Sequence, residues 1–211
     1  MIEKNILRKA VKDILLEYME QGSVKPGERI SLPELAKELE VSATPLREAL
    51  TQLTETGLVT YIANRGFFVS SLHEQEAIEI YELIAILESQ AVLATDFLIS
   101  DLKELEIINA QFKTAQDSIS KLRTDRLFHQ KLIQNYSNQT AKKIIEDIRM
   151  RVFIYEFEFM ESSPIDDSVS MHQEIIDQLK QNRRDEAISI LKSNWEISKN
   201  QILQNFQTKL S

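Results

Sequence analysis

The sequence predicts a mainly α-helical protein, with an N-terminal winged helix-turn-helix followed by an all-α bundle of six or seven helices. Apolar residues recur at helical spacing over most of the chain. Only four glycines and four prolines are available for the many turns of an all-β architecture. One β-branched and aromatic segment, residues 58–69, interrupts the helical pattern and predicts a two-stranded hairpin.

The N-terminal part of the chain has the elements of a winged helix-turn-helix in order. Apolar spacing predicts helices over residues 4–21, 33–40 and 44–56, and Gly57 stops the third. Residues 58–62 and 67–69 then form the two strands of the wing. Because an isolated hairpin is only marginally stable, we expect it to pack on the three helices.

The third predicted helix has the side chains of a helix that reads DNA. Its apolar positions form a buried stripe: Leu46, Ala49, Leu50 and Leu53. The polar side chains on its other faces are of the types that contact phosphates and base edges: Thr44, Arg47, Thr51 and Gln52. Hydroxyl, guanidinium and amide groups near a helix N-terminus suit the DNA major groove. The first hypothesis is therefore a DNA-binding regulator.

From Glu74 onward the pattern is helical almost without interruption. We expect helices near 74–98, 101–119, 121–136, 138–160, 166–181 and 184–208. The breaks fall at short polar sequences, in which Ser and Asp are the expected caps: Ser100-Asp101, Ser120, Ser137-Asn138, Ser162-Ser163-Pro164 and Asn182. Alternating aromatic residues over 153–159 would also suit a strand. The expected domains are residues 1–70 and 71–211.

Charge and composition restrict the class of protein. The net charge of −8 argues against an indiscriminate nucleic-acid binder, and most of the acidity lies after residue 70. The winged helix-turn-helix of residues 1–70, called the head below, is nearly neutral and must therefore use a local basic face to approach DNA. The chain has no cysteine, which excludes thiolate metal sites and fits a reducing compartment. Without a long apolar run, we expect a cytoplasmic protein that does not enter a membrane.

These features resemble the GntR superfamily of bacterial regulators, and more narrowly its FadR-type branch, whose ligand-binding domain is called FCD. The head carries the pattern as Lys25-Pro26-Gly27-Glu28-Arg29-Ile30, Glu34-Leu35-Ala36, Val41-Ser42-x-Thr44-Pro45-Leu46-Arg47-Glu48-Ala49-Leu50, Gly57-Leu58-Val59 and Asn64-Arg65-Gly66. The sparser C-terminal match is Leu87-Glu88, Asp125-x-x-Phe128-His129, Asn138 and His172. The resemblance implies a homodimer in which a small metabolite, such as a carboxylate, alters operator binding.

The resemblance also implies which residues contact DNA. The matching positions in the recognition helix and the wing turn are Thr44, Arg47, Arg65 and Gly66. Arg47 would hold a phosphate or the O6/N7 edge of guanine, unless it is a surface arginine paired with a nearby glutamate, whereas Arg65 with Gly66 would approach the minor groove. The family usually has arginine where this chain has Ala43, and a bidentate contact there is worth about 1–3 kcal/mol of discrimination. We therefore expect a different operator or lower affinity.

A candidate metal site lies in the helical domain. Asp125 and His129 are four residues apart on one predicted helix, so they share a face, and His172 begins a later helix. In metal-binding FCD domains an aspartate and three histidines hold a divalent ion, but Asn194 stands where the third histidine is usual. Asp125, His129 and His172, completed by Asn194 or water, would bind zinc, nickel or manganese. Two alternatives remain open: a metal-free pocket, as in the acyl-CoA-responsive branch, or interior histidines with satisfied hydrogen bonds.

A carboxylate effector would need a guanidinium, which offers a planar fork for two charge-assisted hydrogen bonds. Arg149 and Arg151 are the candidates, although either could be a solvated charge beside Asp147 or Glu156. An enzyme is not expected, because the chain has no HExxH or GxSxG motif and no phosphate-cradling glycine loop.

The sequence thus favours a homodimeric transcriptional repressor that reads an inverted repeat and responds to a small molecule. The alternative is a helical ligand sensor that acts through protein partners and has weak or no sequence-specific DNA reading. This alternative is drawn from Ala43, which lacks the usual arginine side chain, and from the acidic balance of the chain.

Overall fold

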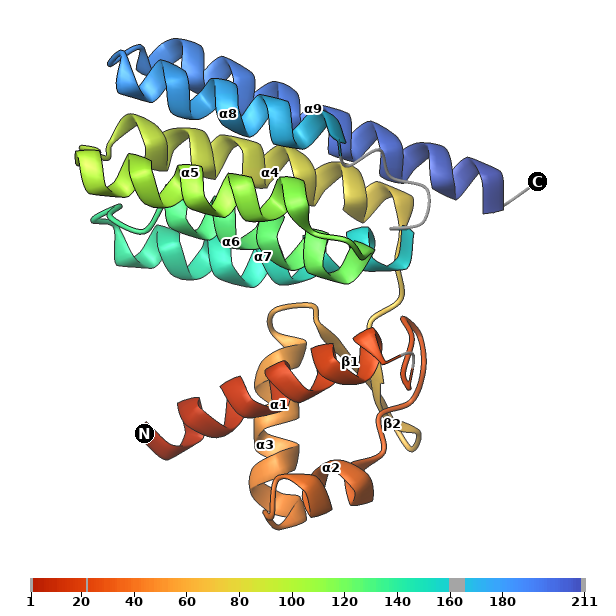
Figure 1. Ribbon diagram of the computed structural model, residues 1–211. Helices are drawn as coiled ribbons and strands as arrows, with labels where there is room; N and C mark the ends of the chain where they lie inside the picture. The colour runs from red at the N-terminus through yellow and green to blue at the C-terminus, as the bar shows by residue number, and fades with distance from the viewer. Residues whose placement is uncertain (1, 22, 160–165, 210–211) are drawn as a thin grey trace. The chain divides into compact units, whose positions relative to one another are not determined.

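The computed structural model describes residues 2–21, 23–159 and 166–209. The chain divides into two compact units, Met1–Leu72 and His73–Ser211. Within the described residues the regular structure is helical except for one two-stranded antiparallel sheet, which confirms the predicted fold class (Figure 1). No helix in these ranges is both long and apolar enough to cross a lipid bilayer.

The first unit contains three helices and the wing. Its elements are α1 (Ile2–Glu20), α2 (Leu32–Glu38), α3 (Ala43–Thr54), β1 (Val59–Ile62) and β2 (Gly66–Val69). The helix α3 packs against α1, α2 and β1. Its predicted apolar stripe is buried, from Leu46 to Leu53, which leaves the polar side chains of α3 on its outer faces.

The wing has a third extended segment that the sequence did not predict. Gly27 donates its amide to the carbonyl of Val69, and Ile30 donates to Phe67, both at 2.9 Å. Arg29 is thereby paired with Phe68 across the free edge of β2. The segment covers an edge that would otherwise present unpaired amides and carbonyls.

The second unit is a helical bundle. Its six helices within the described residues are α4 (Glu74–Leu93), α5 (Ile99–Thr114), α6 (Ser118–Leu132), α7 (Gln139–Phe159), α8 (Asp166–Lys180) and α9 (Arg184–Lys209). The helix α4 packs against α7 and α9, whereas α5 packs against α6 and α8. The middle of α7 is buried on every side, over residues 149–155. The aromatic alternation of 153–159 therefore belongs to a central helix and not to a strand.

Several predicted boundaries in this unit were wrong. The helix α4 ends at Leu93 instead of residue 98, α5 at Thr114 instead of 119, and α6 at Leu132 instead of 136. The predicted breaks at Ser100-Asp101 and Ser120 lie inside α5 and α6. The cap of α6 is Asp117, whose carboxylate accepts the amide of Ser120 at 2.8 Å. Ser120 is thus part of the capped first turn. The predicted break at 162–164 lies outside the described residues.

Candidate functional site

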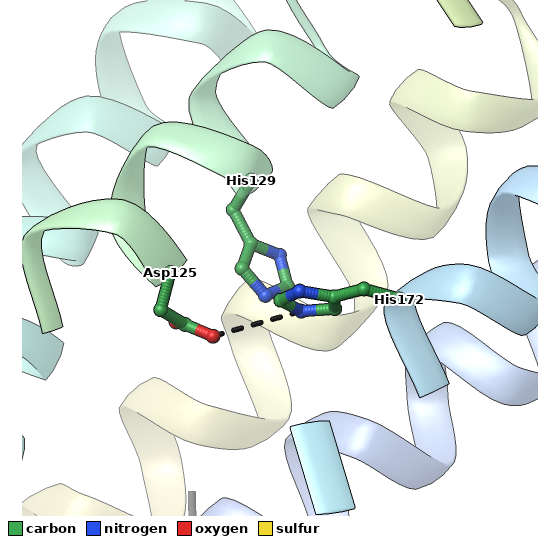
Figure 2. A group of neighbouring side chains, drawn as sticks. All are labelled: Asp125, His129 and His172. Atoms are coloured by element: carbon green, nitrogen blue, oxygen red, sulfur yellow. Dashed lines mark ion pairs between the residues drawn. The ribbon is translucent and has the colours of Figure 1, made fainter. Parts of the chain in front are cut away.

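The predicted metal-binding side chains come together inside the second unit. Asp125 and His129 project from one face of α6, and His172 reaches them from α8 (Figure 2). One potential ligand atom of each residue lies within 4.8 Å of the others. Asp125 Oδ1 lies 3.6 Å from His172 Nε2. That separation suits two atoms that share a metal ion at about 2.1 Å each.

His172 is buried without the hydrogen bonds that an interior histidine needs. Its ring stacks on Phe128, with the centroids 3.7 Å apart and an interplanar angle of 7°. Neither ring nitrogen has a hydrogen-bond partner among the described residues. Burial first, and then the nearby His129, hold the pKa of His172 well below its usual value. A neutral imidazole with an unpaired nitrogen fits a metal ligand better than it fits an interior histidine with satisfied hydrogen bonds.

His129 has a very different environment, because Glu88 of α4 binds it. His129 Nδ1 lies 2.8 Å from Glu88 Oε2. Burial alone would raise the pKa of Glu88, but Arg149 and His129 outweigh it and leave that pKa below its ordinary value. Glu88 is therefore an ionised carboxylate in the interior, and its charge is balanced by hydrogen bonds instead of water.

The two candidate arginines are buried in ion pairs, which contradicts the alternative that they are solvated charges. Arg149 donates through Nε and Nη2 to Glu88 Oε1, at 2.8 and 2.5 Å. Arg151 pairs instead with Glu76 in the first turn of α4, with Nε 3.1 Å from Oε1. Arg149 thus adjoins the histidines through Glu88, whereas the described ion-pair partner of Arg151 is a different carboxylate.

Asn194 is buried on α9, beside Trp195. Its amide nitrogen contacts Ser168 Oγ at 3.4 Å, on the helix that carries His172. The ring of Trp195 packs against His129, with the centroids 4.4 Å apart. The α9 segment therefore borders the cluster, and a role for Asn194 as a ligand stays a prediction.

The sequence alone assigns Glu88 no role beyond its place in the family pattern Leu87-Glu88. A signal was available, since Glu88 lies at helical spacing with the apolar residues Ala77, Tyr81 and Ile84 on the buried face of α4. A lone acid on such a stripe requires a buried partner. Glu156 of α7, which the sequence suggests only as a partner for an arginine, is a second acidic residue of this unit with a shifted pKa. Burial, and then Asp125, raise its pKa well above the usual value.

The predicted DNA-contacting residues lie on the outer faces of the first unit. Thr44 and Arg47 are exposed on α3, and Gln52 is half-buried. Thr51 is exposed too, but its hydroxyl donates to the carbonyl of Arg47 at 2.8 Å. Part of its hydrogen-bonding capacity is therefore used within the helix.

Two exposed arginines lie at the wing, Arg65 in its turn and Arg29 on the segment that pairs with β2. The guanidinium of Arg65 lies over the ring of Phe68, 5.3 Å from its centroid. Gly66 has a φ of +100°, and a Cβ built there would lie 3.7 Å from Nε of Arg29. The sequence does not indicate a role for Arg29 at the wing, because the pairing of residues 27–30 with β2 leaves no local pattern.

Two family models match the chain, one within each unit. Residues 7–69 match the bacterial regulatory proteins of the gntR family, and residues 79–196 match the FCD domain. The Nta operon transcriptional regulator of Aminobacter aminovorans is 39% identical over 134 residues, which cover 61% of this chain and 63% of that protein. The regulator McbR of Escherichia coli is 28% identical over 156 residues, with coverages of 69% and 71%.

The first of these alignments, and that with the regulator YdhC of Bacillus subtilis, span less than two thirds of the relative's length. Two solved structures share the fold over almost the whole chain. A transcriptional regulator from Rhodococcus sp. RHA1 has a TM-score of 0.78 at 23% identity, covering 93% of this chain and 97% of the other. Escherichia coli McbR/YncC has a TM-score of 0.79 at 21% identity, covering 95% of this chain and 98% of the other.

Proposed function

Because the chain belongs to the GntR family of bacterial regulatory proteins and carries an FCD domain, we propose that it is a transcriptional repressor whose operator affinity is controlled by a small molecule. The observation that supports DNA reading is the exposed polar face of α3, opposite its buried stripe and within one unit with a basic wing. Two such heads in a homodimer would read the two halves of an inverted repeat.

The DNA interface that we propose has two parts. In the major groove, Thr44 and Arg47 at the N-terminal half of α3 contact a phosphate or a base edge, supported by Gln52 and Thr51 further along. At the wing, Arg65 and Arg29 contact the backbone beside the minor groove, and Gly66 leaves room for close approach. Ala43, the first residue of α3, supplies no base contact of its own beyond a methyl group.

Selection from a random duplex library with the purified protein tests this function. We expect an enriched inverted repeat, and on that duplex we expect Arg47→Ala to weaken binding by at least about tenfold, as loss of one charged contact would. Arg183→Ala, which removes an exposed charge from the second unit, should leave the affinity unchanged. Retention of DNA without an enriched motif would instead favour a sensor that acts through protein partners.

For the effector site we propose that Asp125, His129 and His172 hold a divalent ion, zinc, nickel or manganese, with Asn194 or water completing the shell. Such an ion supplies positive charge and an open coordination position for a carboxylate. The guanidinium of Arg149 is already taken by Glu88, so an effector carboxylate at the ion avoids competing for it. The unpaired nitrogens of the buried His172 support this arrangement.

The metal content of purified variants tests the site. We expect about one zinc ion per chain after dialysis against zinc, and a stoichiometry near zero for His129→Ala, because a buried ligand is lost. His73→Ala is the matched control, since His73 lies at the N-cap of α4 and is not one of the clustered side chains. Equal metal-to-protein ratios in all three proteins would refute the site.

A further inference from the structure

Glu88 is the point at which four helices of the second unit meet. Its Oε2 accepts hydrogen bonds from His129 of α6 and from Trp195 of α9, with Nε1 of Trp195 at 3.0 Å. Its Oε1 accepts both hydrogen bonds from Arg149 of α7. The side chain is completely buried. A fully satisfied carboxylate of this kind is held in one rotamer and cannot relax toward water.

This arrangement decides which nitrogen of His129 is available. Since an ionised carboxylate only accepts hydrogen bonds, Nδ1 of His129 must carry the proton that it shares with Glu88. In the neutral ring Nε2 then keeps its lone pair, and His129 turns its imidazole toward Asp125 and His172 (Figure 2). We propose that Glu88 is a positioning residue for the metal site, which fixes the tautomer and the ring orientation of His129.

The same network fixes Glu88 and His129 together. Arg149 Nη2 bonds the carboxylate of Glu88 and also donates to the backbone carbonyl of His129. Trp195 donates to Glu88 while its ring packs on the imidazole. The orientation of His129 is thus set before any ion arrives, so binding need not order that ring.

The contrast with His172 shows why the loss of Glu88 should change the tautomer of His129 alone. The ring of His172 is oriented by stacking on Phe128, and neither of its nitrogens has a hydrogen-bond partner in the described ranges. Stacking fixes the plane of a ring but does not choose which nitrogen carries the proton. Of the two histidine ligands, His129 alone therefore has its tautomer set by a carboxylate, within the part of the chain that is described.

The chain offers a matched control for this inference. Glu76 and Glu88 both lie on α4, and each pairs with a buried arginine of α7, Glu76 with Arg151 and Glu88 with Arg149. Glu76→Gln removes an α4–α7 ion pair, as Glu88→Gln does, but Glu76 is not hydrogen-bonded to a metal-ligand candidate in the described network. A general weakening of the bundle would affect both variants.

The experiment combines ¹⁵N NMR of the histidine rings in the metal-free protein, at mildly alkaline pH, with zinc affinity measured by chelator competition. We expect the Nδ1–H tautomer of His129 in the parent protein and in Glu76→Gln. In Glu88→Gln we expect a mixture of tautomers and a zinc affinity lower by about 10–100-fold. Circular dichroism should show the same helical content in all three proteins.

If Glu88→Gln does not fold, the double variant Glu88→Gln/Arg149→Met removes the unpaired buried cation and should fold with the same loss of affinity. An Nε2–H tautomer of His129 in the parent protein would overturn the inference, and so would unchanged tautomer and affinity in a folded variant. The inference rests on the proposed metal site, yet the two can fail separately. A parent protein with the expected tautomer but no zinc binding would remove the metal site alone.

Discussion

His172 shows how a single buried residue makes stability depend on pH. Its folded-state pKa lies well below the usual value, whereas in the unfolded chain it titrates near its ordinary pKa of about 6.5. As pH falls below that value, His172 becomes protonated in the unfolded chain but stays neutral in the folded protein. The stability contributed by the neutral ring is therefore fully present above about pH 6.5. As pH falls from there to the folded-state pKa, this contribution to the unfolding free energy declines by at most about 1.4 kcal/mol per pH unit.

The prediction compares two proteins, because other groups titrate in the same range. Between pH 7 and pH 5, the metal-free parent should lose more unfolding free energy than His172→Gln, which has no imidazole to protonate. Urea melts in the presence of a chelator, at several pH values, provide the measurement. Parallel stability curves for the two proteins would show that the buried imidazole is protonated as easily in the folded state as in the unfolded one.

At the scale of helices and strands, the sequence predicted most of the elements because their apolar periodicity matches their buried faces. The stripe of α3 from Leu46 to Leu53 is an example. The failures have physical causes as well. Polar residues mark many helix ends, but the sequence does not show whether Asp117 or Ser120 provides the cap. Pairing of Arg29 with Phe68 depends on a tertiary contact between distant segments and leaves no local pattern.

The candidate site shows the same division between local and tertiary information. The i, i+4 spacing placed Asp125 and His129 on one face, and the family resemblance supplied His172. The partners of Arg149 and Arg151 could not be found this way. Both are bound by carboxylates of α4, which lie far away in sequence, so local spacing could not indicate these ion pairs.

The outer face of α4 supports a prediction about dimerisation. Leu83, Ile86 and Leu93 are exposed and share one face of the helix, with Ile86 at 61% exposure. A homodimer that buries this stripe would explain an apolar surface on a charged protein. We predict that Ile86→Glu raises the dimer dissociation constant at least about tenfold, because it buries a charge at the contact. Analytical ultracentrifugation of the parent protein and the variant measures this dissociation constant.

The control for that prediction is Ile107→Glu on α5, where the isoleucine is exposed to a similar degree, 58%. This variant should leave the dimer unaffected. If Ile86→Glu remains as dimeric as the parent protein, the α4 stripe is not the interface. If both variants dissociate equally, added negative charge is responsible and the stripe has no special role.

For the whole molecule, the division into two units places the proposed binding sites for operator DNA and for the metal ion on different parts of the chain. The proposed DNA contacts all lie within Met1–Leu72, and the proposed metal ligands within His73–Ser211. A ligand stabilises the structure that it binds, by about 2.7 kcal/mol when its free concentration is about a hundredfold above its dissociation constant. Each ligand should therefore act first on the thermal transition of its own unit.

Calorimetry of the full chain tests this division and the regulatory mechanism together. We expect zinc to raise the transition of the unit that contains the histidines, an effect absent in His129→Ala, and the selected operator duplex to raise the other transition. Because coupling is reciprocal, any factor by which zinc changes operator affinity must equal the factor by which operator changes zinc affinity. A factor of one in both titrations would make zinc a structural ion. Any regulation would then have to come from a further ligand that favours one arrangement of the two heads.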